Sequence, residues 1–409
     1  MSQESAADST APFWEFVPIG DFSLPADTQL NVARKKWRSL RSFFRTSREP
    51  LETHARAEEN LRALPTLQLE NLAPPVHWGT TSAALDRFLA TRSDDGLESE
   101  IFFLIGQPYV DQAAILRHWA ISRKVAVLEG PDPAAILSGQ WNFRKNRESA
   151  HSHWVIPELE RWFLRHANGL WLVREWLEQV ASGGMGGGII GCNSWAWAYL
   201  QRVWPIPNPT ALVLQAFDGR ALARYFMVSS LSGGEKHVHF LNARTGEPLL
   251  SRMGEKTGAE EEVSRDLQQL AAHCRGNVEI ARQYWRKRLR TTPESEQART
   301  FDAEAVSSGP SAGEDVVWLA PGIEAPVLPV ETGDDLIFIL HNLLLHNGLS
   351  ATILAELMPV PKTQLVSNLL RLQSMEMVES SGDVWRVSAH GYPGAREFLR
   401  SHGYLVDAF

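Results

Sequence analysis

Short apolar runs alternate with stretches of helical periodicity between about residues 98 and 225. Each run is followed by turn residues or by apolar positions three to four residues apart, which is typical of strands joined by helices. Such an alternation predicts the α/β class, with a parallel sheet of five strands and helices on both of its faces. The predicted strands are Glu100–Ile105, Lys124–Leu128, His153–Ile156, Ile189–Cys192 and Ala211–Leu214.

A second pattern covers residues 331–409. Three helical stretches precede two short strand-like runs joined by a Ser-Gly-Asp turn, and one more helix follows. This order predicts a winged helix-turn-helix domain. The stretches are Asp334–His346, the residues after Ser350, Lys362–Ser374, Met377–Ser380, Val384–Val387 and Pro393–Ser401.

The other segments are an N-terminal extension over 1–79, a mainly helical segment over 226–291 and a linker over 292–330, with the α/β core over 80–225. Residues 31–48 of the extension contain bases and no acid, and apolar residues recur there at helical spacing. This basic amphipathic helix could bind anionic lipid, nucleic acid or an acidic protein, or it could pack on its own domain. Its candidate partner-binding residues are Arg34, Lys35, Lys36, Trp37, Arg38, Arg41 and Phe44.

Composition excludes several classes of protein. The 409 residues have a formal net charge of -8, so no chain-wide positive field attracts nucleic acid. The two cysteines cannot form a disulfide framework, and the polar start lacks the pattern of a secretory signal. No apolar run is long enough to cross a bilayer. We therefore expect a cytoplasmic protein, with peripheral contact to the inner membrane face left open for residues 31–48.

The end of the first predicted strand is where a phosphate-binding loop would lie. Gly106-Gln107-Pro108 follows that strand and leads into a helix. Together with the five strands, the helical segment and the terminal winged helix, this layout resembles the AAA+ and STAND ATPases, in particular the origin-recognition type. The resemblance implies a P-loop-like core with a helical lid and an ATP site at the strand ends.

The residues at the implied ATP site depart from the pattern of these families. Gln112 and Ala113 stand where a phosphate loop has its lysine and its Ser or Thr, so a phosphate-binding cation and a magnesium ligand are lost. Proline stands at the metal-binding acid after the third strand, where only Glu158 could act as a base. Asn193 matches a polar sensor after the fourth strand, and Glu279 stands at the position of a phosphate-binding arginine.

These departures predict a pseudo-ATPase without catalytic residues, metal ligands or a required cofactor, although ATP binding stays open. The winged-helix segment has five bases against nine acids, a net charge of -4, and its third helix carries only Lys362 and Arg371 as bases. Because phosphate contacts supply most DNA affinity, we favour protein partners for this helix. We therefore expect an interaction scaffold or regulatory subunit. A DNA-associated initiator or regulator, and a non-standard ATPase completed by a partner, remain alternatives.

Overall fold

The computed structural model describes residues 13–25, 61–92, 100–141, 153–182, 186–231, 238–250, 263–292, 315–329 and 333–409. The chain separates into two compact units. The first unit combines residues 1–23, 77–215 and 325–409, and the second combines residues 24–76 and 216–324. The units alternate along the chain, whereas the predicted domains follow one another in sequence.

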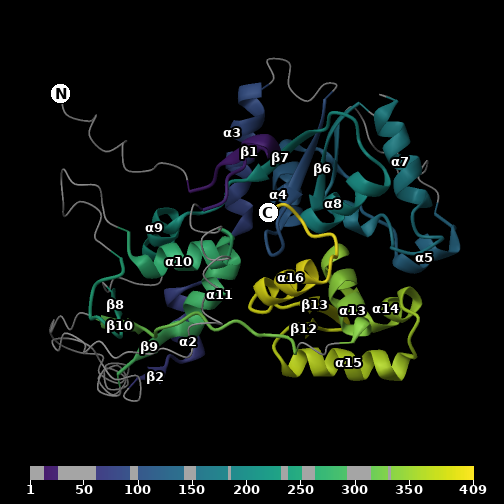
Figure 1. Cartoon of the computed structure of the whole chain (residues 1–409). Helices are drawn as coiled ribbons and strands as arrows, with labels where there is room; N and C mark the ends of the chain where they lie inside the picture. Colours follow the sequence, from purple (N-terminus) through teal and green to yellow (C-terminus); the bar gives the residue numbers. More distant parts are fainter. Residues whose placement is uncertain are drawn as a thin grey trace, which may run out of the picture. The chain divides into compact units, whose positions relative to one another are not determined.

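A six-stranded sheet forms the centre of the first unit (Figure 1), in the order β1-β7-β3-β6-β5-β4. Five strands are parallel, as the alternating pattern predicted, and β1 pairs antiparallel with β7 at one edge. The parallel strands are β3 (Ile101–Gly106), β4 (Ala126–Val127), β5 (His153–Ile156), β6 (Gly187–Asn193) and β7 (Thr210–Leu214). The edge strand β1 (Phe16–Pro18) lies outside the predicted core, because three residues carry too little periodicity to be read as a strand.

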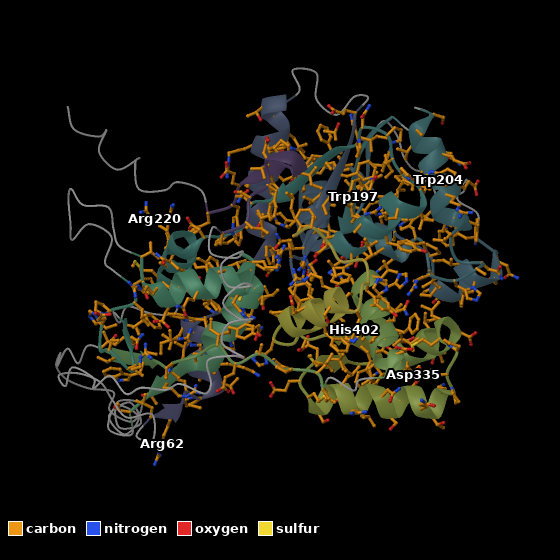
Figure 2. All side chains as sticks on the ribbon, in the orientation of Figure 1. Arg62, Trp197, Trp204, Arg220, Asp335 and His402 are labelled. Atoms are coloured by element: carbon orange, nitrogen blue, oxygen red, sulfur yellow. The ribbon has the colours of Figure 1, made fainter. Side chains whose placement is uncertain are left out.

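Helices cover both faces of this sheet. On one face, Trp197 of α8 (Ser194–Val203), which is labelled in Figure 2, packs on Phe103 of β3 with 5.1 Å between ring centroids. On the other face, Gly191 of β6 leaves room for Leu116 of α4 (Gln112–Arg123). A Cβ added to Gly191 would lie only 2.7 Å from Cδ1 of Leu116. Both helices begin at the carboxyl ends of strands, so their first turns meet at one edge of the sheet.

The C-terminal module, defined here as residues 333–409, packs on that edge of the sheet as part of the first unit. Helix α13 is almost wholly buried, because its apolar residues contact both the core and the rest of the module. The helices are α13 (Asp334–Leu345), α14 (Ala351–Leu357), α15 (Lys362–Ser374) and α16 (Tyr392–Ser401), and the strands are β11 (Leu349–Ser350), β12 (Val378–Ser381) and β13 (Val384–Val387). The predicted helices and the predicted hairpin are confirmed at these positions.

The second unit contains a four-stranded sheet in the order β2-β9-β10-β8, of which only the β10–β8 pair is parallel. Trp285 of α11 is fully buried and stacks on Phe226 of α9 with 4.6 Å between ring centroids. The strands are β2 (Arg62–Ala63), β8 (Val238–Asn242), β9 (Leu289–Thr291) and β10 (Asp315–Leu319), and the helices are α2 (Thr66–Leu72), α9 (Gly219–Leu231), α10 (Arg265–His273) and α11 (Val278–Arg288). Part of the predicted linker is therefore a sheet strand, β10. No helix in the described ranges has the length and hydropathy needed to span a bilayer.

Candidate functional site

The loop after β3 is fixed by a helix cap. β3 ends at Gly106, and the chain turns through buried residues into α4. Asp111 is the N-cap of α4, and its Oδ1 accepts a hydrogen bond from the backbone N–H of Ala114 at 2.8 Å. Asp111 therefore stabilises the first turn of α4. The predicted residues Gln107, Pro108, Gln112 and Ala113 of this loop and turn are all buried.

Tyr109 connects this loop to the C-terminal module. Its φ of +68° lies in the left-handed region, which residues with a side chain adopt at a cost. Its hydroxyl donates a hydrogen bond of 2.7 Å to the carbonyl of Val387 on β13. Its ring also meets Tyr392 edge to face, with 5.8 Å between centroids. The strained turn is thus held in place by contacts far away in the sequence.

Side chains fill the space beside Gly106. A Cβ added to Gly106 would lie 2.4 Å from Oε1 of Gln112, so the amide of Gln112 packs directly against this glycine. Gln112 Nε2 donates to Glu160 Oε1 at 2.9 Å, and the backbone N–H of Asn193 donates to Glu160 Oε2 at 3.0 Å. Glu160 is 1% exposed. The start of α4 and the end of β6 are therefore joined through one buried carboxyl group.

Glu158, the predicted base, points elsewhere. Its Oε2 accepts from Arg117 at 2.9 Å, and its Oε1 pairs with Arg161 at 3.0 Å. Arg117 also pairs with Glu129 at 3.0 Å, which extends the group of ion pairs toward solvent. Glu158 is thus engaged by two arginines, and its neighbour Glu160 is the carboxyl group that reaches the strand ends.

Asn193 makes contacts on two sides. Its Oδ1 accepts the backbone N–H of Trp195 at 2.8 Å and so caps α8. Its Nδ2 donates to the carbonyl of Leu344 on α13 at 2.8 Å. The adjacent Ser194 donates its hydroxyl to Asp407 Oδ2 at 2.6 Å. The end of β6 is therefore bonded to two parts of the C-terminal module.

Two histidines of the C-terminal module lie against the core. The backbone N–H of Arg165 donates to His346 Nε2 at 3.3 Å, and the His346 Nδ1 lies 3.3 Å from the carbonyl oxygen of Glu160. His341 Nδ1 lies 3.4 Å from the Arg165 guanidinium. Burial lowers the pKa of His341 and of His346 to about 4, and the charge of Arg165 acts in the same direction.

Burial has the opposite effect on the acid. It raises the pKa of Glu160 to about 7, and the nearby charge of Glu158 adds to this shift. Hydrogen bonds from backbone N–H groups, including that of Asn193, offset only part of this rise in the pKa of Glu160. Glu160 therefore exchanges its proton near neutral pH although it lies inside the protein.

The remaining predicted residues belong to other elements of the structure or lie outside its described part. Glu279 belongs to the second unit, where it forms an ion pair with Arg282 on the same helix. Lys362 and Arg371 are exposed on α15. The basic stretch 31–48, with all its candidate partner-binding residues, lies outside the described residues. No group of three or more His, Cys, Asp or Glu suited to a metal ion occurs in the described part of the chain.

The structure therefore brings together Gly106, Gln112 and Asn193, and it adds residues that the sequence analysis did not select. Glu160 was missed because it lies two residues from Glu158 in a segment with several acids. His346 and Asp407 come from a segment expected to be a separate domain. Only the pairing of the strands, which aligns Gly106 with Asn193, makes this group visible.

No family model matches the sequence, and no curated protein is significantly similar to it. The structure search finds the RuvB Holliday junction branch migration motor of Thermotoga maritima, with a TM-score of 0.28 and 13% identity over 82% of this chain and 99% of that one. A variant of the same motor gives 0.30, with the same identity and coverage. A Walker-type ATPase of Pyrococcus abyssi gives 0.26 at 9% identity, over 86% of this chain and 99% of that one. TM-scores this low carry no argument about fold or function.

Proposed function

We propose that this protein is a catalytically inactive relative of the AAA+ and STAND ATPases and acts as an interaction scaffold or regulatory subunit. In this proposal its partners bind to a C-terminal winged helix and to the basic stretch 31–48. The sheet supports the resemblance, because five parallel strands with helices on both faces are what a P-loop-like core requires. The succession of helices and hairpin in residues 333–409 supports the winged helix.

The observation that carries the proposal is the buried group beside Gly106. A triphosphate at these strand ends would need cations and free backbone N–H groups. The place beside Gly106 is filled by the Gln112 amide, and the N–H of Asn193 is already bonded to Glu160. An ionised Glu160 would also repel phosphate. These residues do not fit ATP.

The C-terminal module contributes a second obstacle. The carbonyl of Leu344 accepts a hydrogen bond from Asn193 Nδ2, and the His346 Nδ1 lies 3.3 Å from the carbonyl oxygen of Glu160. Nucleotide could reach the strand ends only after these contacts break. Each such buried hydrogen bond contributes about 1 kcal/mol, and leaving its partner unpaired costs more. A closed edge of this kind suits a module that presents surfaces to partners.

Nucleotide titration tests the inactive-site part of the proposal. A fluorescent ATP analogue with magnesium should show no saturable binding to the full chain at millimolar concentration, and phosphate release should equal the buffer rate. The double substitution Gln112→Lys with Ala113→Thr restores the missing side chains and is the matched comparison. Micromolar binding to the unmodified chain that is lost in Gln112→Ala would refute the proposal.

A DNA-associated factor is the second candidate, and one observation favours it. The exposed side of α15 carries Lys362 and Arg371, and the helix contains no acid. Retention on a DNA duplex that falls steeply with salt, and that is lost when both bases are replaced, would support this candidate. Deletion of residues 331–409 is a poor test of either candidate, because it would expose the buried side chains of the core edge, such as Trp195.

A further inference from the structure

Helix α15 presents an exposed face at the outer side of the C-terminal module (Figure 1). Its inner face is fully buried through Leu365, Leu369 and Leu372. On the outer face, Val366 is 37% exposed and Leu370 is 53% exposed. These two residues are four apart, so their side chains are neighbours and form one apolar stripe.

Two cations flank this stripe. At 100° per residue, Lys362 lies one turn before Val366 on one flank, and Arg371 lies beside Leu370 on the other flank. Both are exposed, and neither forms an ion pair with any described residue. The sequence of α15 contains no acid, whereas the segment 331–409 that contains it has a net charge of -4, from five bases and nine acids. The positive end of the helix dipole adds to the field at Lys362.

We propose that the outer face of α15 binds a helical segment of a partner protein that carries two adjacent apolar side chains flanked by carboxylates. This inference rests on the proposed interaction role and specifies the surface and the chemistry of the partner. The stripe would bury the partner's apolar side chains, and the two cations would pair with its acids. Lys362 and Arg371 are nine residues apart, which corresponds to about 13 Å along the helix axis, so the matching carboxylates lie about nine residues apart on a helical partner.

The surroundings of α15 favour protein over DNA. A helix that reads a major groove presents donors and acceptors to base edges, but Val366 and Leu370, the exposed large apolar residues of α15, offer neither. The turn of the neighbouring hairpin carries an exposed acid, Asp383, and Glu379 on β12 is exposed as well. Carboxylates on the hairpin repel any anion that reaches them, so the two cations suit an acidic segment no longer than α15 better than an extended phosphate backbone.

The test uses the full chain and a labelled synthetic helix with two leucines four residues apart and flanking glutamates. Fluorescence anisotropy should show binding that weakens with salt, and Leu370→Asp should reduce the affinity by about tenfold or more, as expected for a buried apolar contact replaced by a charge. Lys362→Glu should reduce it by about threefold at low salt. The control Ile121→Asp makes the same apolar-to-acid change on α4, where Ile121 is 76% exposed, and should have no effect.

Two further probes can overturn the proposal. A peptide with lysines in place of the glutamates should not bind, and equal binding of both peptides would refute the role of charge. If the protein binds a DNA duplex and Lys362→Glu abolishes that binding, the face belongs to DNA and the proposal is refuted. If the acidic peptide does not bind at all, the proposal is refuted as well. The nucleotide titration does not involve α15, so its outcome judges the inactive-site proposal separately.

Discussion

Replacing Glu160 by glutamine tests the electrostatics of the buried group directly. Glu160 is 1% exposed, and its two oxygens accept from Gln112 Nε2 and from the backbone N–H of Asn193. Glutamine has the same shape and can still accept from Asn193, while the amide of Gln112 can turn to present its oxygen. The substitution therefore removes the charge and keeps the hydrogen bonds.

The sign and size of the effect follow from the pKa of Glu160, which burial raises from 4.5 to about 7. Between these values the folded protein keeps a proton that the unfolded chain has released, so stability falls as pH rises through this interval. A difference of about 2.5 pKa units corresponds to roughly 3 kcal/mol above pH 7. Because glutamine does not ionise, Glu160→Gln should be more stable than the unmodified protein by about 1 kcal/mol at pH 5 and by about 3 kcal/mol at pH 8.

Urea unfolding followed by tryptophan fluorescence at the two pH values measures this difference. The matched control is Glu158→Gln, which removes a carboxylate that pairs with Arg117 and Arg161 and should bring no gain at pH 8. A Glu160→Gln protein that is less stable than the unmodified protein at pH 8, or whose advantage does not grow with pH, would refute the assigned protonation of Glu160.

Four further substitutions test the fold around this group. Gly191→Ala should lower the free energy of unfolding by about 3 kcal/mol, because the added Cβ would lie 2.2 Å from a backbone oxygen. In Gly106→Ala the added Cβ meets only a movable side chain, so this variant should lose less stability, and thermal melts compare the two variants. Burial lowers the pKa of His346 to about 4, so the stability of the protein should rise between pH 4 and 6.5 as the unfolded chain loses its proton at this residue. His346→Gln should make this rise smaller, and an unchanged pH profile of stability would contradict the prediction. Asp407→Ala leaves the buried Arg396 guanidinium without its ion-pair partner, so the last residues should become sensitive to carboxypeptidase digestion. Equal digestion rates of the two proteins would argue against the role of Asp407 in fixing these residues.

Strong local periodicity made most of the first unit predictable. The five parallel strands and the helices of residues 333–409 lie where the apolar runs predicted them, because each is long enough or apolar enough to show its period. The short strand β1 has no such signal, and β10 forms only because β8 and β9 lie on either side of it. Local pattern therefore predicts elements well and their long-range partners poorly.

The candidate site shows the same limit. Sequence spacing selected Glu158, but the chain leaves β5 through a single 3-10 turn at Leu159–Arg161, and this turn decides which of two acids faces inward. The contacts of Asn193 with Leu344 and of Ser194 with Asp407 span 151 and 213 residues. Pairings over such distances leave no trace in a single sequence.

The bonds between the sheet edge and the C-terminal module make the two parts one cooperative structure. Asn193 caps α8 and holds Leu344, so a displacement of α13 would remove a buried partner from the same residue whose N–H is bonded to Glu160. Asp407 likewise accepts from Ser194 of the core and from Arg396 of the module. Opening the edge would expose several of these groups at once, and because each loss costs about 1–3 kcal/mol, the sum approaches the whole stability of a typical domain. Ligands at the strand ends would have to offset that cost, whereas a partner on the outer face of α15 would not, which is why binding should occur on that face.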